Sequence, residues 1–430
     1  MENRTQIKLI KEKIGQEITI AGFVQTVRDQ GGIKFIMLRD VTGIVQIVIL
    51  KSEKEVFDFV KELTLESVVK IIGKVKEEKQ APEGIEVQAF KIEVLSKAEP
   101  ELPIPVIDKA NEEVDITKRL DWRWLDLRKP EKTQIFKVWT EFERSVREHL
   151  LANGFIQICT PSFMVSPSET GSEVFEVEYF DRKAYLAQSP QFYKQMAMAA
   201  GFEKVFAFVP AFRAEPSFTA RHMTEFTSWD FEMSYIESHL DIMALEERLL
   251  IKAFTDLKNN LGIDIEIPIS PFPKVSISEA KKILTEAGKV GDKAGDMSDE
   301  EERSLGEIIK QKTGSDFVFL TDYPQQGRAF YHMRHDEDKN LTKGFDLLYK
   351  GLEITTGAQR EHRVEILKSQ ALERGVSLES IEDYLNFFTY GCPPHGGMAW
   401  GPGRLIMKIL NLSSVKDATF LPRDVKRLRP

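Results

Sequence analysis

Residues 212–226 read Phe212-Arg-Ala-Glu-Pro-Ser-Phe-Thr-Ala-Arg-His-Met-Thr-Glu-Phe226 and lie between two predicted strands. Arg213 and Glu215 are two positions apart, so on a strand they project from one face. After a short loop, Arg221 and His222 begin the return strand. The hairpin therefore gathers two guanidinium groups, an imidazole and a carboxylate over one surface. Guanidinium forks suit a polyphosphate ligand, although an ordinary salt-bridged surface hairpin carries the same charges.

A second group of charged residues lies in Phe345-Asp-Leu-Leu-Tyr-Lys-Gly-Leu-Glu353. A turn at Lys350-Gly351 would fold Asp346 back beside Glu353. Two neighbouring carboxylates repel each other unless a cation lies between them, and Mg²⁺ is commonly held by one or two carboxylates plus substrate phosphates. Just downstream, Arg360 can reach an anion past small residues. The alternative is a capped junction between a strand and a helix.

A third stretch combines glycine-rich backbone with one arginine, Arg404, and reads Gly391-Cys-Pro-Pro-His-Gly-Gly-Met-Ala-Trp-Gly-Pro-Gly-Arg-Leu405. Such backbone lets a flat ligand lie close to the chain. The sequence contains neither a G-x-x-x-x-G-K-[ST] loop nor a G-x-G-x-x-G turn after a strand, and no Cys/His cluster has zinc-binding spacing. A nucleotide ligand would therefore be held without either common phosphate-binding loop.

The amino-terminal part of the chain shows five short alternating strands, with a helix over Glu53–Leu65 after the third. Turns are predicted at Gly31-Gly32, Thr42-Gly43 and Pro82-Glu-Gly84. This order predicts a small closed barrel of the OB type over residues 1–105, although any small β-domain would show similar alternation. The predicted strands are 18–24, 34–39, 44–49, 68–75 and 85–94.

Residues 98–115 carry three prolines among acidic residues, which is typical of a linker, and the linker is placed at 106–130. Beyond it, residues 131–430 mix long helices with antiparallel strands but lack regular βαβ spacing. This pattern favours an α+β catalytic domain. An insertion at about 240–340 carries its own helices, and the sequence assigns no function to it. The predicted strands are 203–213, 225–236 and 343–356, and the predicted helices are 132–153, 241–261, 276–287 and 298–313.

The chain has 430 residues, 30% of them charged and 42% hydrophobic, which is a globular composition. Its net charge of −9 argues against a nucleic-acid partner, because phosphate binding normally needs a basic surface. Residues 1–105 are nearly neutral, however, so the charge of the whole chain does not describe a surface on the barrel. Two cysteines, no apolar run of membrane-spanning length and no signal-peptide core predict a cytoplasmic protein with no membrane partner.

Taken in this order, the stretches resemble the class II (subclass IIb) aminoacyl-tRNA synthetases, specifically the aspartyl-tRNA synthetases of the archaeal type, over essentially the whole chain. Motif 1 of the class resembles Leu150–Pro161, motif 2 resembles 212–235, and motif 3 resembles 396–405 with Arg404. The resemblance implies a ligase that uses ATP to form aspartyl-adenylate and transfers L-aspartate to tRNA(Asp), with tRNA(Asn) as a further acceptor in relaxed enzymes. It also implies Mg²⁺ as cofactor, an anticodon-binding barrel and a homodimer with Pro161 in its interface.

The resemblance assigns the nucleotide-binding residues position by position. Arg213 matches the motif 2 arginine that holds the α-phosphate and the substrate carboxylate. Phe226 and Arg404 match the groups on the two faces of adenine, and Arg213 and Arg404 are the residues assigned to catalysis. The complete ATP set is Arg213, Glu215, Arg221, His222, Met223, Phe226, Glu353, Gly401 and Arg404. The metal set is Asp346, Glu353 and Thr356.

The amino-acid site follows from the same resemblance. Lys194 and Arg360 match the two cations that pair with the side-chain carboxylate of aspartate, and two buried cations would reject neutral asparagine. Glu169, Gln191 and Asp230 match groups near the substrate ammonium. The complete aspartate set is Glu169, Gln188, Gln191, Lys194, Arg213, Asp230, Thr356 and Arg360.

In the barrel, Arg28, Phe35 and Gln46 match residues that read the central anticodon base. Phe35 would stack on an unpaired base while Gln46 bonds its edge. From the sequence alone, packing of Phe35 in the barrel core is an equal alternative. Gln25 and the loop 79–82 lie where strict and relaxed enzymes differ. Because Gln25 is not the tryptophan associated with strict enzymes, the sequence favours relaxed tRNA choice.

Two positions depart from the family pattern: Gly403 replaces a glutamate, and Met398-Ala399-Trp400 replaces an aromatic-glycine pattern. Neither change removes a proposed ligand. Three alternatives stay open, namely an asparagine–tRNA ligase, a paralogue that makes an amide without tRNA, and an RNA-binding protein with an inactive synthetase fold. The second would be expected to lack the barrel, and the third would be expected to lack Arg213, Glu353 or Arg404.

Overall fold

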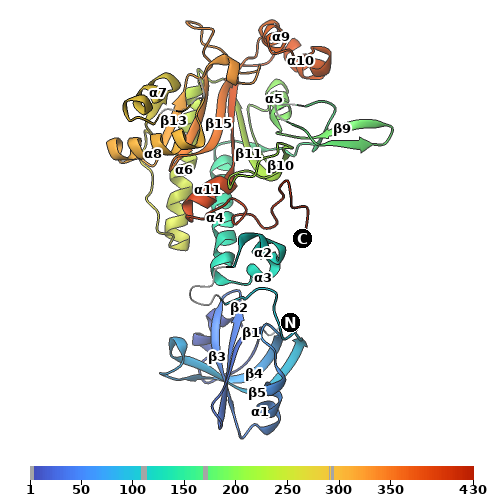
Figure 1. Ribbon diagram of the computed structural model, residues 1–430, viewed down its shortest axis with the longest axis vertical. Helices are drawn as coiled ribbons and strands as arrows, with labels where there is room; N and C mark the ends of the chain where they lie inside the picture. Colours follow the sequence, from blue (N-terminus) through green and yellow to red (C-terminus); the bar gives the residue numbers. More distant parts are fainter. Residues whose placement is uncertain (1–3, 108–113, 168–172, 290, 292–294) are drawn as a thin grey trace. The chain divides into compact units, whose positions relative to one another are not determined.

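The computed structural model describes residues 4–107, 114–167, 173–289, 291 and 295–430. The chain divides into two compact units, 1–133 and 134–430 (Figure 1). The predicted domain boundaries near residues 105 and 130 stay predictions, since helix α4 (Pro130–Ala152) runs across the division between the units. Within the described residues, no helix combines the length and the apolar character needed to cross a membrane.

The first unit contains the predicted barrel. Among the described residues, five strands close in the order β1-β2-β3-β5-β4. They are β1 (Glu17–Asp29), β2 (Ile33–Asp40), β3 (Gly43–Leu50), β4 (Val68–Glu77) and β5 (Ile85–Ser96). All five predicted strands are confirmed, and so is the helix after the third, which is α1 (Lys54–Phe59) extended by a 3₁₀ turn at Val60–Glu62. The expected OB-type barrel is therefore confirmed.

Strand alternation sends one set of apolar side chains into the barrel, where they are fully buried. This core includes Ile20, Val24, Ile36, Leu38, Ile47, Val69, Ile71 and Val87. Two short helices, α2 (Ile116–Asp121) and α3 (Arg123–Asp126), belong to the same unit and lie inside the predicted linker. Arg128 follows them and places Nη1 3.1 Å from the buried carboxylate of Glu66. This ion pair ties the helical segment to the barrel.

The second unit is built on one large, mostly antiparallel sheet, which confirms the α+β prediction. Across the described residues its strand order is β12-β13-β14-β15-β16-β11-β10-β6. In that order the strands are Lys274–Ser276, Phe317–Thr321, Gly344–Tyr349, Leu352–Arg360, His395–Trp400, Glu225–Ser234, Lys204–Phe212 and Ile156–Gln157. The three strand regions predicted from the sequence form β10, β11 and the β14–β15 hairpin of this sheet.

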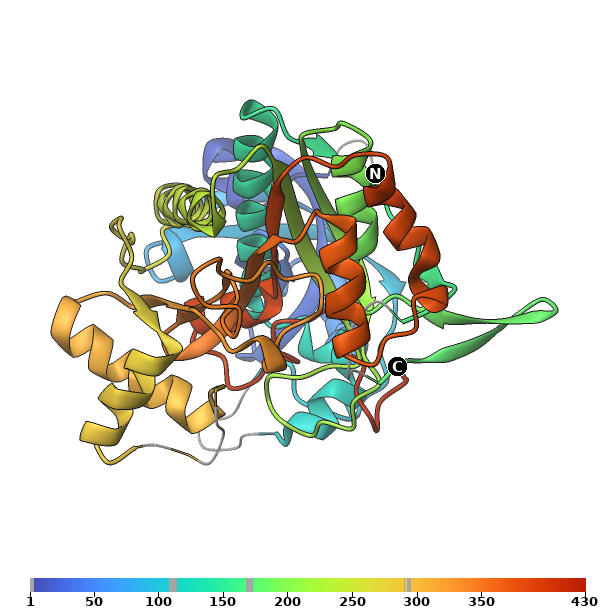
Figure 2. The same ribbon diagram turned by 90° about the horizontal axis from the view of Figure 1, so that it is seen from above.

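Helices cover the sheet and supply its core. Helices α4 and α6 (His239–Leu261) lie side by side (Figure 2), joined where Ser145 Oγ donates to Asp256 Oδ2 over 2.6 Å. Phe142 of α4 stacks on Trp229 of β11, with ring centroids 5.6 Å apart. The remaining long elements are α5 (Gln191–Ala199), α9 (Val364–Glu373), α10 (Glu382–Thr389) and α11 (Pro402–Ile409). A smaller sheet of β7 (Phe163–Met164), β9 (Arg182–Leu186) and β8 (Glu176–Tyr179) completes the described unit.

The insertion at 240–340 forms the predicted helices within about two residues of their expected ends. Besides α6, they are α7 (Ile277–Glu286) and α8 (Asp299–Thr313). Each of the three helices begins at a serine N-cap with a capping box, which satisfies backbone N–H groups that have no partner within the helix. Strands β12 and β13, which extend the main sheet, were not predicted. Both are short, and an apolar run of that length fits either a strand or a helix.

Candidate active site

The loop after β10 carries residues that the sequence analysis placed on strands, and that prediction is wrong. Strand β10 ends at Phe212 and β11 begins only at Glu225. Beyond the ladder, Arg213 N still donates to Thr224 O over 2.9 Å, but Ala214 N donates to Glu173 O instead. The chain therefore leaves the sheet at this point, and the charged side chains of motif 2 are positioned by a loop.

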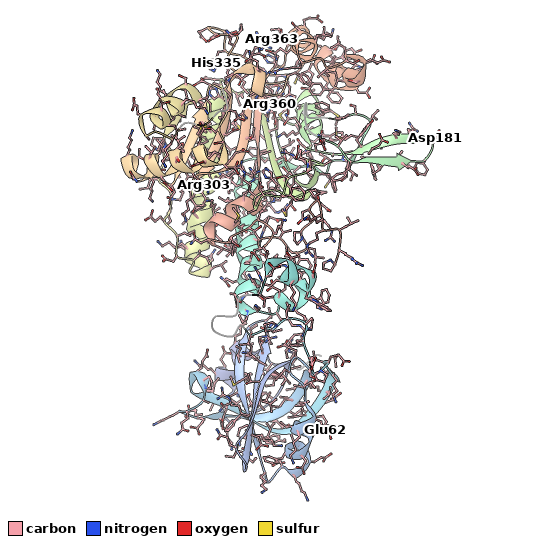
Figure 3. All side chains as sticks on the ribbon, in the orientation of Figure 1. Glu62, Asp181, Arg303, His335, Arg360 and Arg363 are labelled. Atoms are coloured by element: carbon pink, nitrogen blue, oxygen red, sulfur yellow. The ribbon has the colours of Figure 1, made fainter. Side chains whose placement is uncertain are left out.

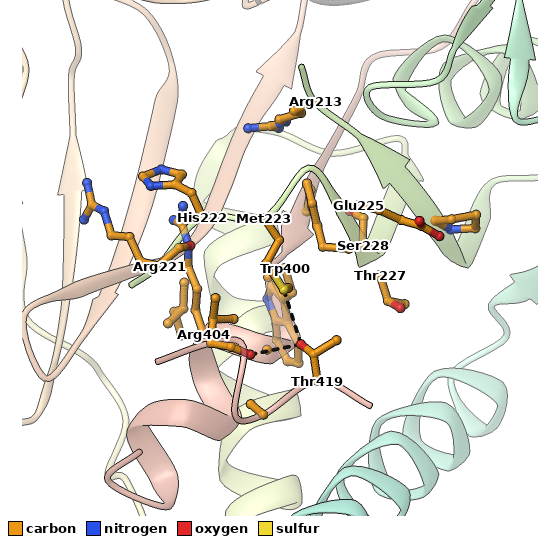
Figure 4. A pocket seen from close by; sticks show the side chains of 18 of the residues that line it. Arg213, Arg221, His222, Met223, Glu225, Thr227, Ser228, Trp400, Arg404 and Thr419 are labelled. Atoms are coloured by element: carbon orange, nitrogen blue, oxygen red, sulfur yellow. Dashed lines mark hydrogen bonds between the residues drawn. The ribbon is translucent and has the colours of Figure 1, made fainter. Parts of the chain in front are cut away.

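This loop nevertheless brings the predicted nucleotide residues together. A pocket of about 680 Å³ lies between the loop, β15, β16, the start of α11 and the carboxyl-terminal segment. Arg221, His222 and Arg404 gather on one side of it (Figure 4). All nine residues predicted to bind ATP line this pocket, namely Arg213, Glu215, Arg221, His222, Met223, Phe226, Glu353, Gly401 and Arg404.

The arginines of the pocket are arranged to receive an anion. Arg213 places Cζ 5.5 Å from the ring centroid of Phe226, and its buried Nε has no hydrogen-bond partner among the described residues. Arg404 donates from Nη1 to the carbonyl oxygen of Glu353 over 3.1 Å. Buried donors are normally satisfied, so an orphan donor in a pocket points to a missing acceptor. A phosphate oxygen would supply that acceptor.

The electrostatics of the pocket agree with this reading. His222 accepts or donates a hydrogen bond at Nδ1 with Thr219 Oγ1 over 2.5 Å. Burial, together with Arg404 and Arg221, lowers the pKa of His222 to about 4. The imidazole is therefore neutral at pH 7, and the positive charge of the pocket comes from its arginines. These arginines favour a polyanionic ligand on their side of the pocket, although Glu215, Glu225 and Glu353 also line it.

Two functional candidates on α8 were missed by the sequence analysis. Arg221 donates from Nη1 to Glu302 Oε2 over 2.8 Å and from Nη2 to Asp299. Glu302 also accepts from Glu353 N over 3.3 Å. Burial and the carboxylate of Glu353 raise the pKa of Glu302 to about 7. No local sequence signal could reveal these partners, because α8 lies about 80 residues from the loop.

The predicted turn between β14 and β15 forms at Lys350-Gly351, where both residues have positive φ angles of 47° and 66°. The register places Thr356 opposite Asp346, while Glu353 lies opposite Leu348 beyond a bulge. Thr356 Oγ1 donates to Glu353 Oε1 over 3.2 Å. The turn therefore brings Asp346, Thr356 and Glu353 to one region, as the sequence predicted.

These residues fit a magnesium ion in part. Glu353 and Thr356 present oxygen donors to the pocket, and oxygen is the ligand that Mg²⁺ prefers. Burial and the nearby carboxylate of Glu353 raise the pKa of Glu302, so two carboxylates lie close together at this end of the pocket. Both oxygens of Asp346 are held by Arg328, at 3.0 and 2.5 Å. Among the described side chains, no group of three His, Cys, Asp or Glu residues has metal-binding geometry.

The predicted amino-acid residues form a buried charged cluster. Lys194 Nζ donates to Asp230 Oδ1 over 2.8 Å, and Arg360 Nε donates to Glu232 Oε1 over 3.1 Å. Arg360 lies at the end of β15 (Figure 3). Although burial opposes it, the cations Arg360 and Lys194 hold the pKa of Glu232 below its ordinary value. Ser228 lines the pocket and donates to Asp230 Oδ2 over 2.6 Å, which connects the cluster to the pocket.

Not every predicted aspartate residue lies in this cluster. Arg213 and Thr356 line the nucleotide pocket, whereas Gln188 and Gln191 are buried near the start of α5. Glu169 lies outside the described residues. Glu232 was missed, although a signal existed. It lies two positions after Asp230 on β11, so strand alternation sends both carboxylates to one face.

The predicted anticodon residues lie on strands β1, β2 and β3 of the barrel. Arg28 pairs with Phe35 in the register, and Phe35 pairs with Val48. Phe35 is half-buried outside the barrel core, whereas its neighbour Ile36 is fully buried inside it. The core-packing alternative for Phe35 is therefore wrong. Arg28 is exposed, and Gln46, also on β3, donates to Glu86 Oε2 over 3.0 Å.

The structure also locates Pro161 and the departures from the family pattern. Pro161 is exposed between β6 and β7, near the exposed apolar side chains of Ile156 and Phe163. A Cβ atom at Gly403 would lie only 2.9 Å from Val415 Cγ2, so a glutamate there would force a shift. Met398 and Trp400 are core residues, and of the two Trp400 also lines the pocket.

Comparison with known proteins identifies the family. Residues 115–425 match the family of class II tRNA synthetases (D, K and N), and residues 18–95 match the OB-fold nucleic acid binding domain. The aspartate–tRNA(Asp/Asn) ligase of Methanopyrus kandleri is 44% identical to this chain over 428 residues, which cover 97% of each protein. The aspartate–tRNA(Asp) ligase of Pyrococcus horikoshii is 40% identical over 432 residues, which cover 98% of each protein.

Solved structures agree with the sequence comparison. The asparaginyl-tRNA synthetase of Pyrococcus horikoshii, complexed with asparaginyl-adenylate, has a TM-score of 0.92 and 32% identity, and the match covers 100% of both chains. The family model spans more than half of this chain and includes all three motif regions. The chain therefore belongs to the class II tRNA synthetases of the D, K and N group.

Proposed function

We propose that the chain is an aspartate–tRNA ligase. It activates L-aspartate with ATP, releasing diphosphate and forming aspartyl-adenylate, and then transfers aspartate to the 3′ end of tRNA(Asp). The observation that carries this assignment is the nucleotide pocket joined to a buried cluster that contains Lys194 and Arg360. The relatives named as aspartate–tRNA ligases, at 40–44% identity over nearly the whole chain, support it.

The choice of aspartate rests on the burial of two cations. Lys194 is 1% exposed and Arg360 is 3% exposed. In such surroundings the attraction between a cation and a substrate carboxylate is much stronger than in water. The neutral amide of asparagine would gain less from these cations, which also pair with Asp230 and Glu232. An asparagine–tRNA ligase is the second candidate, because a synthetase holding asparaginyl-adenylate shares the fold at a TM-score of 0.92.

The residues of the pocket supply the chemistry of activation. The substrate carboxylate attacks the α-phosphate, and this step depends on positioning and charge stabilisation more than on proton transfer. Arg213 holds both reacting groups, with its orphan Nε as a donor. Phe226 and Arg404 enclose adenine from its two faces, and Glu215 accepts from the adenine amino group.

The terminal phosphates of ATP lie beside Arg221 and His222 in this proposal. Glu353 and Thr356 would hold Mg²⁺, and Asp346, the third predicted ligand, would have to release Arg328 to join them. When bound, Mg²⁺ neutralises the β- and γ-phosphate oxygens and assists the departure of diphosphate. The fit of Glu353 and Thr356 at the pocket wall supports this assignment.

The barrel binds the anticodon, with Arg28, Phe35 and Gln46 as the reading residues. The half-buried ring of Phe35 outside the core leaves a face on which a base can stack. We further propose that tRNA(Asn) is a second acceptor. Gln25, whose Oε1 accepts from Arg39 Nη1 over 3.3 Å, stands where strict enzymes would have tryptophan.

The proposal includes a homodimer and a cytoplasmic location. Pro161 is exposed and lies in the sequence between Ile156 and Phe163, two exposed apolar residues that a second copy would cover. Both cysteines, Cys159 and Cys392, are free thiols, which suits a reducing compartment. Sedimentation velocity of the purified chain would measure the dimer.

Charging of purified tRNAs tests the complete reaction. We expect aspartate to be attached to tRNA(Asp) and to tRNA(Asn), with ATP and Mg²⁺ required for both. Attachment to tRNA(Asp) alone would show that the enzyme is strict and would contradict tRNA(Asn) as a second acceptor. Attachment of asparagine in place of aspartate would favour the second candidate, and no charging with either would favour an inactive synthetase fold.

A further inference from the structure

Beneath the amino-acid cluster, a chain of hydrogen bonds runs from α5 to the start of β16. It begins at His395, which is 0% exposed. His395 Nδ1 lies 2.8 Å from the carbonyl oxygen of Pro393, and His395 Nε2 lies 2.9 Å from Gln195 Nε2. Each link of this chain has a direction that follows from elementary donor and acceptor chemistry.

The carbonyl oxygen of Pro393 can only accept, so His395 Nδ1 must carry the proton of that bond. Burial lowers the pKa of His395 to about 4, so the ring is neutral and its Nε2 has a free lone pair. Nε2 therefore accepts from the amide nitrogen of Gln195. This fixes which end of the Gln195 amide points to the histidine.

The fixed amide of Gln195 determines the next link. Its oxygen, Oε1, accepts from Gln191 Nε2 over 2.9 Å and from the hydroxyl of Tyr384 over 3.1 Å. The amide of Gln191 therefore turns its nitrogen toward Gln195. The carbonyl oxygen of Gln191 takes no part in the bond to Gln195 and points the other way. A carbonyl oxygen is the group that a substrate ammonium requires, whereas an amide nitrogen would repel it.

We propose that Gln195 and His395 are positioning residues that fix the Gln191 amide with its oxygen toward the ammonium group of the amino-acid substrate. The inference rests on the proposed function, since it assumes that Gln191 faces the substrate ammonium. Neither positioning residue touches the substrate in this arrangement. A reversed Gln191 amide would set its own oxygen against Gln195 Oε1, and because both atoms only accept hydrogen bonds, the relay prevents that reversal.

Comparing L-aspartate with succinate, which keeps both carboxylates but lacks the ammonium, tests this role. The KM for aspartate and the inhibition constant of succinate are measured in ATP–pyrophosphate exchange. For Gln195→Met we expect the KM for aspartate to rise roughly tenfold or more, as for a lost bond to a charged group. The inhibition constant of succinate and the KM for ATP should change less than about threefold.

Variants of His395 separate positioning from packing. His395→Gln can place an acceptor near the position of Nε2 and should keep the KM for aspartate within about threefold of the original chain. His395→Leu removes the acceptor and should reproduce the effect of Gln195→Met. Tyr384→Phe is the matched control, because it removes one bond to the same Gln195 oxygen without releasing the amide.

Equal losses for aspartate and succinate in Gln195→Met and His395→Leu would overturn the inference and leave both residues a packing role. Unchanged values for both ligands would overturn it as well. The original chain reports on the proposed function separately. If that chain activates asparagine and not aspartate, the proposed function fails, and the same comparison is made between asparagine and succinamate, its analogue without the ammonium.

Discussion

Arg221 donates a hydrogen bond from Nη1 to Glu302 Oε2 over 2.8 Å, and this bond joins the motif 2 loop to helix α8. The same carboxylate accepts from Glu353 N. Helix α8 therefore borders the end of the pocket where the terminal phosphates of ATP are proposed to bind. Arg221 pairs with Glu302 in this structure and is also proposed to bind the terminal phosphates. Glu302 therefore competes with the phosphates for the guanidinium group.

The competition predicts a pH-dependent effect of Glu302→Gln on ATP binding. Because the pKa of Glu302 is raised to about 7, the carboxyl is mostly ionised at pH 8 and mostly protonated at pH 6. The variant lacks the negative charge at both pH values. We expect the KM for ATP to fall about threefold or more at pH 8 and to change little at pH 6. Steady-state exchange at the two pH values measures this.

Asp299→Asn is the control for this prediction, because Asp299 also pairs with Arg221 but its side chain is 51% exposed. Solvent screens that carboxylate, so its loss should have a smaller effect. A KM for ATP that rises at both pH values in Glu302→Gln would contradict competition. It would show that Glu302 chiefly anchors Arg221.

Glu246 predicts a pH-dependent gain in stability. Its buried Oε1 accepts from Thr355 Oγ1 and Trp400 Nε1, at 2.5 and 2.9 Å. Burial raises the pKa of Glu246 to about 8, so the folded chain keeps this proton while the unfolded chain loses it above its ordinary pKa near 4.5. The folded state is therefore penalised increasingly as the pH rises from about 4.5 to 8. Glu246→Gln, which stays neutral, should raise Tm at pH 8 by several degrees and have little effect near pH 5.

Thermal unfolding followed at both pH values measures this difference. Glu237→Gln, on a residue that is exposed just before α6, provides a control in which the Tm difference should not change with pH. A Tm of Glu246→Gln that falls at pH 8 would mean that the carboxyl is ionised in the folded protein.

Arg360 is expected to serve aspartate much more than ATP. Arg360→Leu removes a buried cation that pairs with Glu232, so we expect the KM for aspartate to rise by about 100-fold or more. The KM for ATP should stay within about threefold, because Arg360 does not line the nucleotide pocket. Arg363→Leu is the control, since Arg363 lies three residues away, is largely exposed and pairs with Glu361. Equal losses for both substrates in Arg360→Leu would contradict the assigned role.

Phe35 is expected to contribute to tRNA binding and not to the fold. Phe35→Ala should raise the KM for tRNA about tenfold, because stacking of one base on an aromatic ring contributes about 1–3 kcal/mol. Amino-acid activation should be unchanged. Phe90→Ala, on β5 of the same barrel, is the control with an exposed ring. A large drop in Tm for Phe35→Ala, with unchanged KM for tRNA, would restore a packing role.

Local patterns predicted the elements of the fold well where they were long or regular. The helices α6 and α8 were predicted within about two residues of their ends, and alternation located the five barrel strands. The short strands β12 and β13 were missed, because segments of three and five residues are too short for their periodicity to distinguish a strand from a helix. Hairpin length was also overestimated, since the loop after Phe212 has no periodicity of its own.

The candidate site was predictable wherever a motif carried the information. All nine nucleotide residues line one pocket. What escaped prediction were partners distant in the sequence, such as Glu302 for Arg221 and Arg328 for Asp346. Both partners come from the insertion, whose folding onto the sheet edge no local pattern reveals. Glu232 is different, because strand alternation beyond Asp230 pointed to it.

ATP–pyrophosphate exchange with the purified full-length chain most directly tests whether this synthetase activates aspartate. The measured quantity is kcat/KM for aspartate and for asparagine under identical conditions. We expect aspartate to be preferred by at least about 10³-fold, because the two buried cations, Lys194 and Arg360, are matched by a carboxylate and not by an amide. A preference for asparagine would contradict the assignment.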